Sequence, residues 1–120
     1  MLEVGSRRRA QPPPPRVVYE ALVEPERDPA RRWLVLLDDE RAPRLIETDP
    51  PRLVVWSSLW DKRPDATVRF DIAAAASGQG SDLRWTLFVA EPAPEPALLG
   101  HLRKRLNELV NANLRYSFGQ

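Results

Sequence analysis

Alternation of apolar and polar residues predicts a β-hairpin in the second half of the chain. Residues 67–72 and 82–89 both alternate with a period of two, which is typical of strands that have one buried face. Between them, the segment 77–81 contains two glycines and supplies the turn. The inward positions by this alternation are Val68, Phe70, Ile72, Leu83, Trp85, Leu87 and Val89.

An earlier hairpin is predicted over residues 44–57. Residues 44–48 and 52–57 read as two short strands joined by the turn Asp49-Pro50-Pro51. Trp56 and Val55 fall on opposite faces of the second strand, and the pattern does not decide which face is buried.

The C-terminal segment changes to a helical period. From Ala97 to Tyr116 the chain is predicted to form one long amphipathic helix. Asn113 is the polar residue nearest the centre of its apolar stripe, and His101 lies on the opposite side together with Lys104, Arg105 and Glu108. The stripe consists of Leu98, Leu99, Leu102, Leu106, Leu109, Val110, Asn113 and Leu114.

Proline clusters divide the N-terminal third. Residues 2–10 read as a strand, and the run Pro12 to Pro15 separates it from a two-turn helix over residues 16–23. Asp28-Pro29 predicts the start of a second short helix that continues through Leu37. Residues 38–43, with three adjacent acids, read as a polar connector.

The order of elements is a strand, two short helices, an antiparallel run of strands and one long helix. This order indicates an α+β fold in which the helix packs on one sheet face. This order of elements, together with three short sequence segments, resembles the SRPBCC, or START-like, superfamily. That superfamily includes the Bet v 1-like proteins and the polyketide cyclase/dehydrase and lipid-transport proteins. The three segments are Gly80-Ser81-Asp82-Leu83, Pro50-Pro51-Arg52-Leu53-Val54-Val55-Trp56 and Asn113-Leu114-Arg115-Tyr116.

The resemblance covers essentially the whole chain and implies a single domain over residues 1–120. It implies the helix-grip fold, in which a curved antiparallel sheet wraps around the C-terminal helix and encloses a pocket for an apolar ligand. The sequence predicts about five strands where the superfamily usually has six or seven. A smaller sheet encloses less volume, so a small or open cavity is expected.

Composition removes most catalytic chemistry. The chain has 120 residues, no cysteine, one histidine and a formal net charge of +1. Thiol nucleophiles, zinc sites built on cysteine and two-histidine metal motifs are therefore excluded, and no cofactor is expected. The charge gives no field that favours nucleic acid, and no apolar run is long enough to span a membrane. A cytoplasmic location is the default expectation.

Seven residues are predicted to line a ligand cavity between sheet and helix. Tryptophan is frequent, with four copies, and an indole offers a stacking surface and one N–H donor, although a role as core anchors of a small domain is the favoured interpretation of these residues. Asn113 would orient a polar group of the ligand or make a structural hydrogen bond. The predicted set is Trp33, Phe70, Trp85, Leu87, Leu102, Leu106 and Asn113.

Three functions remain open from the sequence. The first is a domain that binds an apolar or aromatic small molecule. The second is an enzyme of the polyketide cyclase/dehydrase type, for which Tyr19, Arg103 and Asn113 are the available polar residues. The third is a non-catalytic interaction module with a closed cavity, whose partner is another protein or a second copy in a homodimer.

Overall fold

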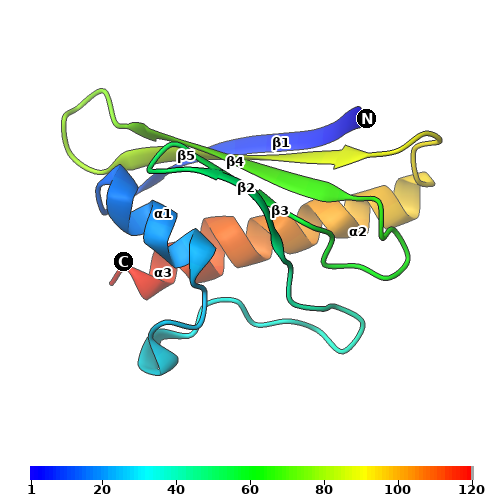
Figure 1. Cartoon of the computed structure of the whole chain (residues 1–120), viewed down its shortest axis with the longest axis horizontal. Helices are drawn as coiled ribbons and strands as arrows, with labels where there is room; N and C mark the ends of the chain where they lie inside the picture. Colours follow the sequence, from blue (N-terminus) through cyan, green and yellow to red (C-terminus); the bar gives the residue numbers. More distant parts are fainter. Residues whose placement is uncertain (120) are drawn as a thin grey trace.

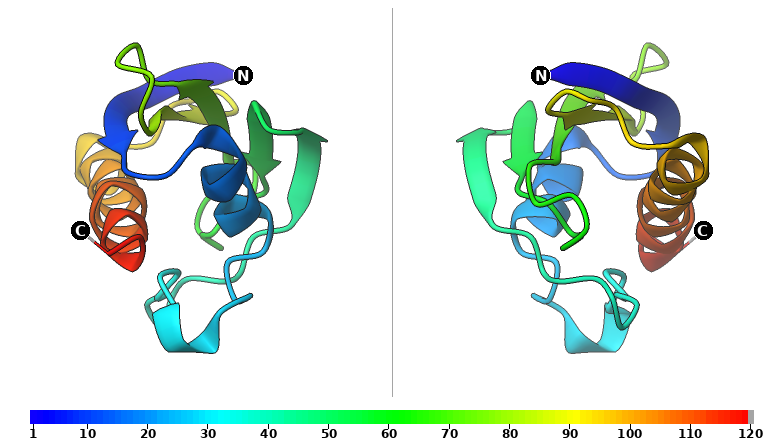
Figure 2. Two further views of the ribbon diagram at one scale, coloured as in Figure 1. Left: turned by 90° about the vertical axis from the view of Figure 1, so that its left-hand side faces the viewer. Right: turned by 90° about the vertical axis from the view of Figure 1, so that its right-hand side faces the viewer.

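The computed structural model describes residues 1–119, without the side chain of Arg31. Its core is one antiparallel sheet with the strand order β1-β5-β4-β3-β2. The sheet curves over one long C-terminal helix and over α1, which lies beside that helix (Figures 1 and 2). The strands are β1 (Leu2–Gln11), β2 (Leu45–Asp49), β3 (Leu53–Trp56), β4 (Thr67–Ala74) and β5 (Ser81–Val89). The predicted α+β helix-grip architecture with five strands is confirmed.

The inward faces of β4 and β5 are those predicted from the alternation. All seven residues that the alternation predicts to face inward are buried. The two strands pair in register from Thr67 with Phe88 to Ala74 with Ser81. On β3 the structure decides the open question, because Val54 and Trp56 are buried whereas Val55 is half-buried. The tight turn before β5 uses Gly80 at φ +76°, where a Cβ atom would lie 2.5 Å from the carbonyl oxygen of Gln11.

Helix α1 (Pro15–Val23) forms as predicted, with proline in its first turn. Val18 and Leu22 are fully buried and four residues apart, so they share the face that packs against β3 and β4. A nine-residue helix is marginal in isolation, and this packing stabilises it.

The second predicted helix is one turn long rather than three. Asp28 caps it through a hydrogen bond from the Ala30 amide (3.0 Å), but the 3₁₀ turn η1 ends at Arg31 (Pro29–Arg31) and Arg32 is already extended. Tertiary contacts explain the difference, because Trp33 stacks on Trp56 and the carbonyl of Val35 accepts a hydrogen bond from the C-terminal helix. We call residues 32–44 the crossover loop.

The C-terminal helix runs without a break through α2 (Pro96–Leu106), η2 (Asn107–Leu114) and α3 (Arg115–Ser117). Its middle third, η2, is π-helical, so its hydrogen bonds join residues five apart instead of four. This changes which residues face the sheet. Asn111 is buried at 5% exposure, whereas Asn113, which an α-helical period placed near the centre of the stripe, is half-buried on the flank.

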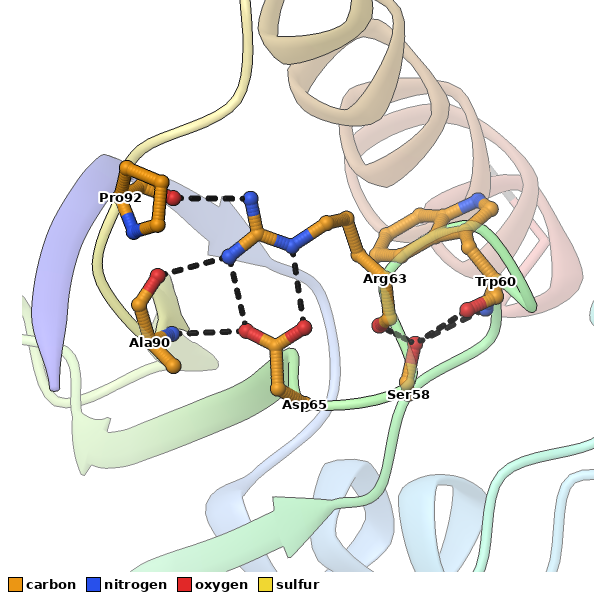
Figure 3. Close-up of polar contacts among 6 residues, drawn as sticks. All are labelled: Ser58, Trp60, Arg63, Asp65, Ala90 and Pro92. Carbon is orange, nitrogen blue, oxygen red and sulfur yellow. Dashed lines mark hydrogen bonds and ion pairs between the residues drawn. The ribbon is translucent and has the colours of Figure 1, made fainter.

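Arg63 and Asp65 tie the connection between β3 and β4 to the end of β5 (Figure 3). The guanidinium of Arg63 donates two hydrogen bonds to Asp65 (2.9 and 3.0 Å) and reaches the carbonyls of Ala90 and Pro92. The Ala90 amide donates to the same carboxylate (2.7 Å). The arginine bonds outweigh the effect of burial, and with the Ala90 amide they lower the pKa of Asp65 from 3.8 to about 2.

Replacing Asp65 by asparagine is expected to lower the free energy of unfolding at neutral pH by about 1–2 kcal/mol, after allowance for partial exposure. A lowered carboxyl pKa contributes stability above the unfolded-state value of 3.8, and this contribution is lost as pH falls toward 2. Urea unfolding at several pH values should therefore show the gap between the two proteins narrowing below about pH 4. Asp61→Asn is the control, since Asp61 pairs with Arg41 on the exposed surface. If the difference in unfolding free energy between wild type and Asp65→Asn stays constant with pH, the lowered pKa of Asp65 is contradicted.

Candidate functional site

The structure brings six of the seven predicted ligand-contacting residues into one buried cluster. Phe70, Trp85 and Leu87 come from the sheet, Leu102 and Leu106 from the helix, and Trp33 from the crossover loop. Phe70, Leu87, Leu102 and Leu106 have no exposed surface. Asn113 lies apart from them, on the flank of the helix, beside the exposed side chains of Arg32, Val35 and Tyr116.

A hollow with a volume of about 320 Å³ opens at one end of this cluster, and we call it the α1 hollow. It is lined by the exposed side of α1, the segment that follows α1, and the C-terminal end of the long helix. Helix α1 and the C-terminal end of the long helix lie at the same end of the molecule (Figure 1). Its apolar wall consists of Val17, Ala21, Pro25, Trp33 and Phe118. Of the seven predicted residues, Trp33 is the one that contributes to this wall.

Trp33 connects the hollow to the core. Its ring stacks on Trp56 with centroids 6.0 Å apart, and Trp56 meets Phe70 edge to face at 4.7 Å. The indole N–H of Trp56 is bonded to the carbonyl of Leu22 (3.0 Å), which fixes that ring. The indole N–H of Trp33, by contrast, is buried and has no partner among residues 1–119. A buried donor without an acceptor costs free energy, so an acceptor for this N–H would be stabilising.

Charged side chains surround the entrance of the α1 hollow. Glu20 accepts hydrogen bonds from Arg27 (2.7 Å) and Arg16 (3.2 Å), and these two arginines lower its pKa. Both carboxylate oxygens of Glu20 are therefore engaged, and the group is ionised. Glu20 orders the entrance and is poorly suited to accept a proton from a ligand.

Comparisons with known proteins identify the fold. A scan against protein-family models found no match, and a search of curated proteins found no similar sequence. Solved structures do match. CalU16 from Micromonospora echinospora has a TM-score of 0.67 at 17% identity, covering 90% of this chain and 70% of its own. DynU16, a protein in the dynemicin biosynthetic locus, has a TM-score of 0.65 at 17% identity over 92% of this chain and 45% of its own.

This chain has the helix-grip fold that the resemblance implied. A third match is the Aha1 dimer from Colwellia psychrerythraea, with a TM-score of 0.62 at 11% identity over 93% of this chain and 99% of its own. At these identities the likeness concerns the fold. Self-association of this helix-grip chain therefore stays a prediction.

A buried ion pair closes the side of the helix-grip core that the sheet leaves open. Arg105 on the helix binds Glu40 of the crossover loop through two hydrogen bonds (2.7 and 2.9 Å), and the Glu40 side chain is completely buried. The carboxylate also accepts from the Leu37 amide and from the Trp60 indole, both at 2.9 Å. Burial alone raises the pKa of Glu40, but the bonds from Arg105, Leu37 and Trp60 outweigh it, so the pKa lies below its usual value.

This pair corrects two expectations from the sequence. Arg105 was placed on the solvent side of the helix, and Glu40 in a polar connector. Arg105 is only 6% exposed, because it lies three residues after Leu102 and four before Leu109, both of which face the core. That spacing was the available signal. The partner, Glu40, carries no such signal, because the path of the crossover loop is set by tertiary contacts.

The one histidine of the chain, His101, is exposed, as its helical phase predicted. Among residues 1–119, no group of three histidine, cysteine, aspartate or glutamate side chains is placed to hold a metal ion. Over the same range, none of the helices has the length and apolar character needed to cross a bilayer.

Proposed function

We propose that this helix-grip domain binds an apolar or aromatic small molecule in the α1 hollow. The observation that carries the proposal is a mostly apolar wall to which Trp33 contributes, a residue whose buried indole N–H has no partner among residues 1–119. Ligand sites in proteins typically combine apolar walls with a few fixed polar groups. The fold likeness to DynU16, from a biosynthetic locus, supports a role with small molecules.

The chemistry of the hollow narrows the ligand. Val17, Ala21 and Phe118 offer apolar contact, and the N–H of Trp33 offers one donor. A volume of about 320 Å³ lies at the lower end of the range for small-molecule sites. The preferred ligand is therefore a compact apolar or aromatic molecule with one carbonyl or hydroxyl oxygen that accepts the indole proton.

The other predicted residues have supporting places in this proposal. Phe70 lies behind Trp56 and Trp33, so it fixes the orientation of the ring that contacts the ligand. Trp85, Leu87, Leu102 and Leu106 extend the apolar core beneath the hollow. Asn113 faces the neighbouring depression on the helix flank, which shares Ser117 with the α1 hollow.

A cyclase or dehydrase reaction has no comparable support. Tyr19, Arg103 and Asn113, the polar residues considered for it, do not line the α1 hollow. Arg103 is engaged with the backbone carbonyl of Val4 at 2.7 Å. Binding without chemistry is thus the function that the geometry favours.

Replacing Trp33 by phenylalanine tests the proposal. The ring still stacks on Trp56, but the donor is lost, so affinity for a compound such as 2-naphthol should fall about tenfold. The affinity for naphthalene, which has no acceptor oxygen, should change less than twofold. Isothermal titration calorimetry measures both affinities, and thermal unfolding should show that the variant retains the stability of the wild type.

Filling the hollow gives a second test with a matched control. Ala21→Trp places a large ring in the hollow and is expected to abolish binding of both compounds. Ala73→Trp adds the same side chain at an exposed position of β4 and should leave binding unchanged. The proposal fails if neither compound binds the wild type, or if both variants bind as well as it does.

A further inference from the structure

Strand β1 carries polar and cationic side chains on the face that the sheet turns toward the helix. In its register with β5, Arg9 lies opposite Leu83 and Gln11 lies opposite Ser81. Directly opposite residues of an antiparallel pair share one face, and Leu83 faces the core. Arg8 pairs with Arg84 and therefore points to the other face.

β1 and the C-terminal helix lie side by side along one edge of the molecule, as Figure 2 shows end-on. At one end of this seam the Arg103 guanidinium donates to the carbonyl of Val4 (2.7 Å). Farther along, a surface hollow with a volume of about 410 Å³ is lined by residues from both elements. We call it the β1–helix hollow, and its lining is Arg9, Asn111, Ala112, Arg115 and Tyr116.

The two arginines of this hollow have no counter-charge within the described part of the chain. Within residues 1–119, no carboxylate forms an ion pair with Arg9 or with Arg115. Elsewhere in the described part of the chain, Arg7, Arg8, Arg44, Arg84 and Arg103 also form no ion pair, whereas eight arginines have a carboxylate within 4.0 Å. These are Arg16, Arg27, Arg32, Arg41, Arg52, Arg63, Arg69 and Arg105.

Buried polar atoms at this end of the seam also lack partners in the described part of the chain. Asn111 is 5% exposed, and its amide nitrogen donates to Asn107 (3.0 Å), which also accepts from the Trp85 indole. Its Oδ1 atom has no donor, and the Nε atom of Arg115 has no acceptor. Neither side-chain polar atom of Gln11, on the same face of β1 as Arg9, has a partner. Such atoms are rare in folded proteins and require a ligand or water.

We propose that the β1–helix hollow binds a small hydroxylated anion, with its carboxylate or phosphate on Arg9 and Arg115 and a hydroxyl donating to Oδ1 of Asn111. The anion would form ion pairs with the two unpaired guanidinium groups. The hydroxyl is needed because Oδ1 is an acceptor, which an anion by itself would leave unsatisfied. This site is separate from the α1 hollow and does not depend on the proposed function of that hollow.

Calorimetric titration of the full chain with glucose 6-phosphate, gluconate, glucose and inorganic phosphate tests the proposal. One or both of the first two should bind, and which of them binds distinguishes a phosphate from a carboxylate ligand. Glucose, which lacks the charge, and inorganic phosphate, which lacks the sugar hydroxyls, should each bind at least tenfold more weakly.

The neighbouring arginines of β1 provide a matched pair of variants. Arg9→Ala should weaken binding of the hydroxylated anion at least tenfold, and Arg8→Ala, on the other face, less than twofold at the same ionic strength. Both side chains are exposed, so neither change should impair folding. The proposal is overturned if neither hydroxylated anion binds, if the two variants lose affinity equally, or if inorganic phosphate binds as tightly as glucose 6-phosphate.

Discussion

Replacing Arg105 by methionine is expected to lower the free energy of unfolding by about 3–5 kcal/mol. The substitution keeps most of the side-chain volume but leaves the Glu40 carboxylate buried without its counter-charge. The two hydrogen bonds from Arg105 to Glu40 would be lost, and only those from the Leu37 amide and the Trp60 indole would remain. The carbonyl of Val35 would also lose its donor. The crossover loop would then detach from the helix before the sheet unfolds.

Urea unfolding at neutral pH measures this effect, and Arg103→Met is the control. Arg103 lies on the same helix but is exposed, so the same change should cost about 1 kcal/mol or less there. The double variant Glu40→Leu with Arg105→Met removes both charges and should recover most of the lost stability. A loss below 1 kcal/mol for Arg105→Met would contradict the assigned role of the pair.

The dependence on pH gives an independent signature. In the wild type the lowered pKa of Glu40 means that its contribution is complete above the ordinary value of 4.5 and is lost as pH falls below it. Without Arg105, burial should raise the pKa of Glu40. Acidification would then protonate Glu40 and remove the cost of its buried, unpaired charge in the variant. The stability gap between the two proteins should therefore narrow as pH falls below about 5.

Truncating Phe70 to alanine is expected to cost about 3–5 kcal/mol. The ring is completely buried and meets Trp56 edge to face, and Trp56 in turn stacks on Trp33. Removing it leaves a cavity that the closely packed sheet and helix would only partly fill. The same change should also weaken ligand binding in the α1 hollow, because Trp33 would lose the support behind its stacking partner.

Phe88→Ala is the matched control for this measurement. Phe88 lies on β5, adjacent to β4 in the sheet, but it points to the other face and is half-buried, so a cost of about 1–2 kcal/mol is expected. Urea unfolding again gives both values. If Phe70→Ala costs no more than Phe88→Ala, the space between sheet and helix is not a packed core at this position.

Much of the fold was predictable because its signals are local. The period-two segments gave β4 and β5 with the correct inward faces, and the prolines marked the boundaries of α1. The candidate site was predictable only in part. Trp33 was named as a ligand contact, but the α1 hollow that it lines also needs Val17, Ala21 and Phe118, which come together through the docking of α1 beside the helix end.

Two features had no local signal strong enough to predict them. In the π-helical segment η2, Asn111 rather than Asn113 faces the core. The sequence pattern does not distinguish the two, because both are asparagines near the end of an amphipathic helix. The helix expected up to Leu37 ends at Arg31, and the residues that follow it contact other elements, with Trp33 stacked on Trp56 and the carbonyl of Val35 bonded to Arg105. Each outcome depends on the fit between elements that are distant in sequence.

The sequence by itself determined the order of elements, the inward faces of two strands and the absence of cysteine chemistry, since periodicity and composition depend only on neighbouring residues and on counts. The tertiary structure alone decided which polar groups are buried. Glu40 and Arg105 are 65 residues apart in the sequence, yet they form a buried ion pair. Burial of a charge requires a partner at hydrogen-bond distance, and that distance exists only once the sheet has closed over the helix.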